Sequence, residues 1–193
     1  MNLKSKIVNC VFVLSTLFAT SANAVLITLS PSSQEVGIFQ SVSVDVFVSD
    51  LSDTQALGAF DLELLFDPNI VTFNSITFGS GLGFSFQDTF SVNSGTQAVL
   101  ESSLEFPSDL LAFQLSDFLL FTVNFVSTGF GETLVSLQNV ILGDENGQEI
   151  TDVSFNSANI RVSSPNLVNE PSHIALCLIA LSFLAYRRKK MKS

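Results

Sequence analysis

The segment from residue 25 to residue 163 alternates apolar and polar side chains with a period of two. Alternation of this kind places one apolar row on one face of a β-strand. The three clearest rows are Val42, Val44, Val46 and Val48; Phe60, Leu62, Leu64 and Phe66; and Leu119, Phe121, Val123 and Phe125. Further strands are predicted at 26–30, 71–78, 98–104, 133–140 and 153–162, and no stretch keeps a helical period for long.

Turn-forming residues separate these strands. Asp67-Pro68-Asn69, Asn93-Ser94-Gly95 and Asn146-Gly147 are typical turn sequences. Many short strands joined by turns predict an all-β sandwich or barrel. Cys10 and Cys177 both lie in terminal apolar runs, so the domain has to be stabilised by a packed core rather than by disulfides. We expect its sixteen phenylalanines to fill that core.

The first 24 residues have the layout of a secretory signal peptide. Lys4 and Lys6 precede an apolar run at 7–19, which is followed by the small-residue pattern Ala22-Asn23-Ala24. We predict cleavage by signal peptidase after Ala24, with Ala22 and Ala24 forming the recognition site. The alternative is an N-terminal membrane anchor, for which the apolar run is short.

The C-terminal 25 residues combine a short apolar run with a basic cluster. A polar linker at 164–168 leads to segment 169–193, which contains an apolar run at 174–186 and a basic cluster at 187–192. Thirteen helical residues extend about 20 Å, against a hydrocarbon thickness of about 30 Å. The sequence predicts a short membrane helix whose basic end stays in the cytoplasm.

The charge is distributed unevenly along the chain. All 18 acidic residues fall between Glu35 and Glu170, where Arg161 is the sole basic residue, so the exported portion has a formal charge of −17. Such a portion repels nucleic acid and anionic lipid, and we expect no nucleic-acid partner. It attracts divalent cations or a basic partner; the simpler alternative is that the charge keeps an exported domain soluble.

The order of motifs in the tail resembles the PEP-CTERM sorting signal. Asn169-Glu170-Pro171 precedes the apolar run, and Arg187-Arg188 begins the basic cluster. The family has proline where this chain has Asn169. The resemblance implies processing by an exosortase-type enzyme, with the precursor at the inner membrane and the product at the cell surface or in the extracellular matrix. A permanent single-pass anchor is the alternative.

The domain at 25–163 resembles cohesin modules. The resemblance lies in the alternating strand and Asp-Pro turn at 58–71, the hydrophobic strand at 119–125, Gly131-Glu132-Thr133 and the acidic turn at 144–147. It implies a jelly-roll β-sandwich, related in architecture to a class of carbohydrate-binding modules. Cohesins bind dockerin modules through a sheet face and act in scaffolding rather than catalysis.

The residue types of the domain exclude most enzyme chemistry. His173, in the tail, is the single histidine, and residues 25–163 contain no cysteine or lysine. A Ser-His-Asp triad, a Cys-His pair, a Schiff base and a zinc site of nitrogen and sulfur ligands therefore cannot form there. Two carboxylates suffice for a glycosidase, but the sequence singles out no pair. We predict no catalytic residue, no cofactor-binding residue and no enzyme.

One acidic turn is a candidate calcium site. Asp144, Asn146 and Glu149 gather oxygen ligands around Gly147, and oxygen ligands suit this hard cation. The alternative is an Asn-Gly hairpin turn with solvated acids. A second acidic set, Asp50, Asp53 and Asp61, is a weaker candidate because a loop separates its members.

These observations favour an exported surface or matrix protein whose domain is a non-catalytic binding or attachment module. A carbohydrate-binding module acting on exopolysaccharide is the first alternative. Sugar platforms usually use Trp or Tyr, whereas the chain has no Trp and its single Tyr is Tyr186 in the tail. A permanently membrane-anchored structural envelope protein is the second alternative.

Overall fold

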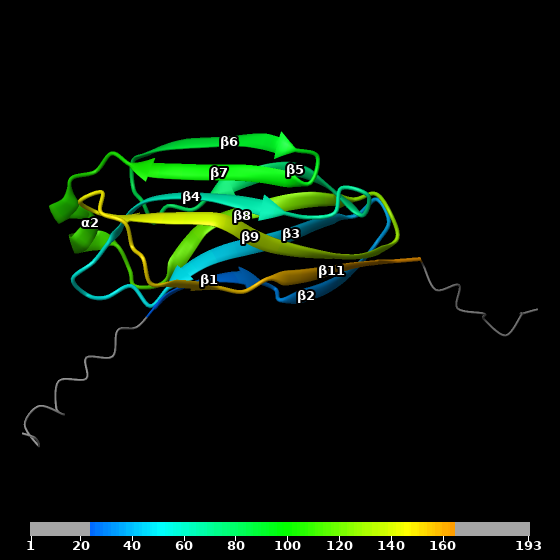
Figure 1. Ribbon diagram of the computed structural model, residues 1–193, viewed down its shortest axis with the longest axis horizontal. Coiled ribbons are helices and arrows are strands. Elements are labelled where there is room, and N and C mark those ends of the chain that lie inside the picture. Colours follow the sequence, from blue (N-terminus) through cyan, green and yellow to red (C-terminus); the bar gives the residue numbers. More distant parts are fainter. Residues whose placement is uncertain (1–23, 165–193) are drawn as a thin grey trace, which may run out of the picture. The chain divides into compact units, whose positions relative to one another are not determined.

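The computed structural model describes residues 24–164, which form two stacked β-sheets (Figure 1). The first sheet has the strand order β10-β1-β3-β8-β5: β10 (Val153–Phe155), β1 (Val25–Ser30), β3 (Ser41–Ser49), β8 (Phe118–Ser127) and β5 (Val71–Phe78). The second has the order β2-β11-β9-β4-β7-β6: β2 (Ser33–Gly37), β11 (Ala158–Ser163), β9 (Gly131–Asp144), β4 (Leu57–Leu65), β7 (Thr96–Ser103) and β6 (Ser85–Asn93). The predicted all-β sandwich is confirmed.

Both sheets are mixed. β1 pairs with β10, and β11 with β2, in parallel, while the remaining pairs are antiparallel. The core lies between the sheets, because each sheet turns its apolar rows inward. The rings of Phe60 in β4 and Phe121 in β8 stack across it with centroids 5.7 Å apart. Phe66 and Phe125 meet edge to face at 5.1 Å.

Among residues 24–164, the hydrophobic cluster extends from Val25 to Val162. β1 begins directly after Ala24. The backbone N–H of Val25 donates to the carbonyl of Asp152 at 2.9 Å. Segment 25–163 therefore contains every strand that the structure describes and the core between the two sheets.

The structure adds three elements that the alternation did not predict and divides one that it did. β2, β6 and a short helix, α2 (Pro107–Phe113), were not expected. Pro107 lies at the start of this helix and Asp109 in its first turn, both typical of helix N-termini. The strand predicted at 153–162 is two strands, β10 and β11, in different sheets.

The prediction that the phenylalanines fill the core is wrong for more than half of them. Phe60, Phe66, Phe121 and Phe125 are buried. Nine of the sixteen have exposed rings: Phe39, Phe47, Phe84, Phe86, Phe90, Phe106, Phe113, Phe130 and Phe155. The aliphatic rows of β1, β3, β4 and β8 already supply much of the core, which leaves these rings for turns and outer faces.

The remaining sequence predictions concern residues outside 24–164. They are the signal peptide with Ala22, the linker from Pro165 onward, and the sorting segment with Asn169, Glu170, Pro171, Arg187 and Arg188. Within the described range, no helix is long and apolar enough to span a membrane.

Candidate functional site

The outer face of β6, β7, β4 and β9 presents apolar and acidic side chains in cross-strand rows. We call this surface the acidic–aromatic face. Its strand register gives three adjacent rows: Phe86, Ser102, Ala59 and Gly143; Asp88, Leu100, Asp61 and Ile141; and Phe90, Ala98, Glu63 and Gln138. Their neighbours along each strand point into the core, because successive side chains of a strand lie on opposite faces.

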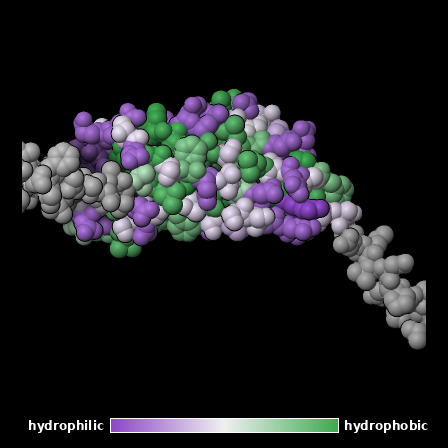
Figure 2. Space-filling view, turned by 60° about the horizontal axis from the view of Figure 1, so that its bottom comes forward, coloured by the Kyte–Doolittle hydropathy of each residue, from purple (hydrophilic) through white to green (hydrophobic). Residues whose placement is uncertain are grey.

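Large apolar groups on this face are open to solvent. Phe86, Phe90 and Ile141 are 56%, 52% and 54% exposed. Exposed apolar groups that lie together commonly mark interaction surfaces. Figure 2, which brings the lower side of Figure 1 forward, shows hydrophobic residues interspersed with hydrophilic ones on that side of the molecule as well.

The electrostatics of the face are one-sided. The outer sides of β6 and β4 carry Asp88, Asp61 and Glu63, and β4, β6 and β7 contain no basic residue. Arg161 in β11 is the single basic residue of the described part of the chain, and its guanidinium lies 3.5 Å from the Glu132 carboxylate. The face therefore offers apolar contacts and negative charge together, a combination that complements a cationic partner.

Beneath this face, the inward sides of β6 and β7 form a hydrogen-bonded polar ladder. Gln97 and Glu101 are each only 2% exposed. The Ser85 hydroxyl and the Gln87 amide donate to Glu101 Oε1 at 2.6 and 2.9 Å. Burial raises the pKa of the Glu101 carboxyl above its ordinary 4.5, and these two hydrogen bonds act in the opposite direction. The ladder supports the strand pair from behind.

Exposed apolar residues also gather around α2. Phe84, Leu104, Phe106, Phe113 and Leu115 are exposed before, within and after the helix. An open hollow of about 510 Å³ lies beside them, with a lining that includes Phe78, Phe113, Leu115, Phe118 and Leu119. Phe84 directly precedes β6, which links this apolar rim to the acidic–aromatic face.

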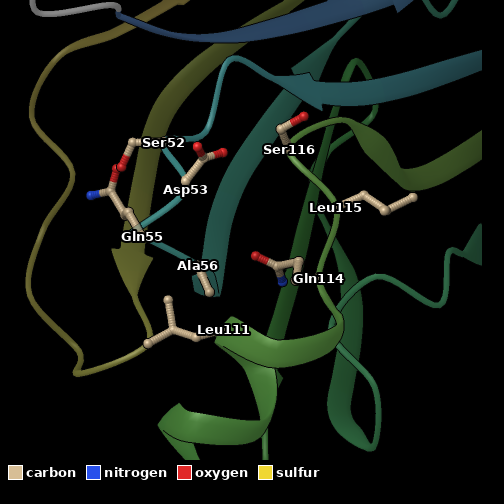
Figure 3. Close-up of a pocket in the computed structure, with 8 residues that line it drawn as sticks. All are labelled: Ser52, Asp53, Gln55, Ala56, Leu111, Gln114, Leu115 and Ser116. Atoms are coloured by element: carbon tan, nitrogen blue, oxygen red, sulfur yellow. The ribbon is translucent and has the colours of Figure 1, made fainter.

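A smaller polar pocket lies between α2 and the loop that joins β3 to β4 (Figure 3). Its volume is about 210 Å³, and its lining consists of Ser52, Asp53, Gln55, Ala56, Leu111, Gln114, Leu115 and Ser116. The Gln114 side chain is already occupied, because it accepts from Leu57 N–H at 2.6 Å and donates to the carbonyls of Leu57 and Gly81 at 2.9 and 3.0 Å. These hydrogen bonds hold α2 against β4, so the Gln114 side chain has a structural role.

The candidate calcium turn is folded as a tight hairpin. Asp144 Oδ1 accepts from the backbone N–H groups of Asn146 and Gln148, both at 2.8 Å. Gly147 has a φ of +76°, which a glycine adopts without strain. Glu149 pairs with Gly143 through an isolated bridge. The turn thus has the predicted hairpin geometry, and calcium binding by Asp144, Asn146 and Glu149 stays a prediction.

The other acidic set does not converge. Asp61 lies on the acidic–aromatic face, Asp53 lines the polar pocket, and the backbone N–H of Asp50 donates to the Asp117 carboxylate at 3.2 Å. Between residues 24 and 164, no group of three or more His, Cys, Asp or Glu side chains is placed to hold a metal ion.

Sequence reasoning missed the aromatic half of the face. Phe86 and Phe90 lie in β6, a strand that was not predicted. A signal for it was present, since Phe86, Asp88 and Phe90 alternate with Gln87 and Thr89 up to the predicted turn at Asn93. Both faces of that run contain polar residues, so no apolar row distinguished a core side.

Solved structures of other proteins place this fold among known folds. No family model and no curated protein matches the chain. A cohesin module of a family 33 glycoside hydrolase from Clostridium perfringens matches with a TM-score of 0.61 at 16% identity, over 74% of this chain and 99% of that module. The described domain has a cohesin-like fold.

Two further cohesin structures also match the described domain. The non-cellulosomal cohesin of Archaeoglobus fulgidus matches with a TM-score of 0.55 at 18% identity, over 78% of this chain and 99% of its own. The sixth cohesin of scaffoldin B from Acetivibrio cellulolyticus, solved in complex with a dockerin, matches with a TM-score of 0.59 at 16% identity, over 73% and 100%. The cohesin-like fold suggested by the sequence is therefore confirmed.

Proposed function

We propose that this protein is an exported, non-catalytic attachment module that binds a basic protein partner through the acidic–aromatic face. The observation that carries the proposal is the composition of that face, where Phe86, Phe90 and Ile141 are exposed beside Asp88 and Asp61 and β4, β6 and β7 supply no cation. A cationic partner with apolar side chains satisfies both halves of such a surface. The cohesin-like fold supports the proposal, because one of its structural neighbours was solved with a dockerin bound.

Site-specific photo-crosslinking tests this assignment in the native host. Phe90 is replaced with the photoreactive analogue p-benzoylphenylalanine, and the matched control carries the same replacement at Phe155, which is 48% exposed on the other sheet. We expect position 90 to capture one discrete protein and position 155 to capture none. Equal adducts from both positions, or none from either, contradict the proposal.

Charge reversal tests the electrostatic half. We expect Asp61→Lys to abolish the adduct at position 90, because it places a cation in the middle of the face. The control is Asp152→Lys, an exposed carboxylate in the loop before β10. If the adduct forms undiminished in Asp61→Lys, the negative charge of Asp61 does not contribute to binding the partner.

The route to the cell surface is part of the proposal. Signal peptidase removes residues 1–24 at Ala22-Asn23-Ala24, and an exosortase-type enzyme then processes the precursor near Asn169-Glu170-Pro171 at the inner membrane. The motif order in the tail supports this route. Intact mass spectrometry of the mature protein tests it: we expect a chain that begins at Val25 and ends near Pro171. A chain that keeps Arg187 and Arg188 favours the permanently anchored alternative.

Binding to exopolysaccharide is the second candidate function. The exposed rings of Phe86 and Phe90 favour it, since aromatic faces can stack on sugar rings and adjacent carboxylates can accept hydroxyl hydrogens. Affinity electrophoresis of segment 25–163 in a panel of polysaccharide gels separates the two functions. If one polysaccharide retards the segment and the Phe90→Ala variant is not retarded, sugar binding is supported. If the segment migrates unretarded in every gel, the protein-binding function is supported instead.

A further inference from the structure

The strand β6 is an edge whose main-chain hydrogen-bonding groups point away from the sheet. The backbone N–H of Leu104 donates to the carbonyl of Phe84 at 2.8 Å, while the Phe84 N–H donates to the Glu105 carboxylate at 2.9 Å. Phe84 and Leu104 therefore occupy a hydrogen-bonded position of the antiparallel ladder, joined by one main-chain bond. Such positions recur at every second residue. The main-chain N–H and carbonyl groups of Phe86, Asp88 and Phe90 therefore face β7. The main-chain groups of Ser85, Gln87, Thr89 and Ser91 therefore face the open side of β6, where no strand among residues 24–164 pairs with it. Figure 1 shows β6 along this border of the sheet.

At the centre of this edge, one side chain forms a hydrogen bond with a main-chain amide. Asp88 Oδ1 accepts from the backbone N–H of the next residue, Thr89, at 2.8 Å. Natural sheets commonly protect an edge with lysine, proline or a charge. Between Ser85 and Asn93 neither lysine nor proline occurs, and Asp88 is the single charged residue. Its carboxylate thus occupies the amide that an added strand would use.

We propose that β6 accepts an added β-strand from a basic, extended segment of the partner. This inference rests on the proposed attachment role and names the chemistry of that partner. A carbonyl of the added strand takes the Thr89 N–H and releases the Asp88 carboxylate, which then pairs with a lysine or arginine of that strand. Phe86 and Phe90 flank Asp88 on the outer face, so the neighbouring outer positions of the added strand are apolar.

Charge complementarity selects this occupant over a second copy of the chain. The outer sides of the strands nearest the edge carry Asp88, Asp61 and Glu63 without a cation, and a second copy would bring the same carboxylates. Like charges brought together at an edge repel, whereas a cationic strand is attracted.

Synthetic strands test the proposal on segment 25–163, which contains every strand and the whole core of the described part of the chain. The probe is a fluorescein-labelled seven-residue peptide, Thr-Val-Thr-Lys-Thr-Val-Thr, followed by fluorescence anisotropy. One control peptide has glutamate in place of lysine. A second keeps the lysine but is N-methylated at alternate amides, which removes main-chain donors without changing the charge. We expect both controls to bind at least tenfold more weakly than the probe. Equal binding of the N-methylated peptide overturns strand addition, and so does a probe that does not bind at millimolar concentration.

Matched variants test the residues. Thr89→Pro removes an edge-facing amide and leaves the β7-facing pairs in place, as proline at an edge strand does. It also removes the Thr89 hydroxyl, which bonds to the Ala98 carbonyl and the Gln97 amide, so the matched control is Thr89→Ala, which loses the same hydroxyl and keeps the main-chain amide. We expect Thr89→Pro to bind the probe at least tenfold more weakly than Thr89→Ala, with the far-UV circular dichroism and the melting temperature of the two variants close to each other. Asp88→Asn weakens the lysine peptide, whereas Asp61→Asn, an equal loss of charge two strands away, leaves it within twofold. Parent-like binding by Thr89→Pro overturns the proposal.

The photo-crosslinking experiment separates this inference from the attachment role. If the adduct at position 90 is lost in Asp61→Lys but retained in Thr89→Pro, the face binds the partner and strand addition is wrong. If sedimentation shows a dimer that Thr89→Pro dissociates, the edge pairs with a second copy and the basic occupant is wrong. Loss of the adduct in both variants supports the edge as the entry point.

Discussion

Replacing Gln114 with leucine should destabilise the domain by disconnecting α2 from β4. The side-chain amide of Gln114 makes three hydrogen bonds, one with the N–H of Leu57, one with the carbonyl of Leu57 and one with the carbonyl of Gly81. Leu57 is 0% exposed, so water cannot take over these groups without opening the structure. Leucine has similar bulk but offers no polar atom.

The cost follows from counting these bonds. A typical protein hydrogen bond contributes about 0.5–1.5 kcal/mol, and a buried group left unpaired costs about 1–3 kcal/mol. Three bonds, of which two end on the buried Leu57 backbone, give a loss of about 3 kcal/mol in the free energy of unfolding. For a domain of this size each kcal/mol shifts the melting temperature by about 4 °C, so we expect Gln114→Leu to melt about 12 °C lower.

Differential scanning calorimetry on segment 25–163 measures this shift, with two controls. Leu115→Ala alters a neighbour that is 70% exposed and should change the melting temperature little. Gln114→Glu keeps an acceptor for Leu57 N–H but sets a carboxylate against two carbonyls, so its loss should be large at pH 7 and smaller when the acid is protonated. A Gln114→Leu protein that melts within 2 °C of the parent would refute the reasoning.

Three further predictions concern the core, the buried acid and the turn. Phe121→Ala should cost about 3–5 kcal/mol in urea unfolding, since its ring is fully buried, while Phe90→Ala should cost under about 0.5 kcal/mol; equal costs would show that the assignment of core and surface is wrong. Because the pKa of Glu101 is raised in the folded state, its burial favours folding below pH 4.5 and loses that benefit as the pH rises through the folded pKa; Glu101→Gln should therefore raise the melting temperature at pH 7 and have little effect at pH 3. Millimolar calcium should raise the melting temperature of the parent but not that of Asp144→Asn. If neither calcium nor a chelator changes the melting temperature of the parent, the predicted metal site is wrong.

The sequence was sufficient to predict the sandwich because its central strands each bury one complete row. Val42, Val44, Val46 and Val48 face the core in β3, and a one-residue shift would expose the whole row. The predicted turn at Asn93-Ser94-Gly95 formed as well, with the Asn93 side chain accepting from the Gly95 N–H at 2.9 Å. In such strands the local pattern and the tertiary environment require the same conformation.

The edge strand β6 was missed because its apolar residues do not form a row on a buried side of the strand. In β6 the inward side chains belong to the polar ladder, with Thr89 donating to the Ala98 carbonyl and Gln97 donating to Thr89. The outward side chains include Phe86 and Phe90, which look like core residues in a sequence. A strand with polar residues inside and aromatic residues outside reverses the usual pattern, and composition therefore assigned its rings to the wrong face.

The charge of the candidate site was predictable from the sequence, whereas its position was not. The excess of acidic residues favours a cationic partner or ligand, which stays a prediction. Placing Asp61 of β4 beside Asp88 of β6 requires the register of β7, which lies between them. The β6–β7 pairing is a local hairpin. The β4–β7 pairing is not, because β5 and β6 lie between these two strands in the chain, and the sequence does not indicate it.

The carboxylates and the exposed rings of the acidic–aromatic face have to be understood together. Exposed rings such as Phe86 and Phe90 would favour self-association on an uncharged sheet, above all beside an unprotected edge. Carboxylates at the intervening positions oppose that contact, since any second copy presents the same charge. In the proposed attachment, the same carboxylates attract a cationic partner, whose approach removes the repulsion and makes the rings available. One set of side chains would then exclude a second copy and admit the proposed partner, which is how specificity arises when attraction and repulsion are built into the same surface.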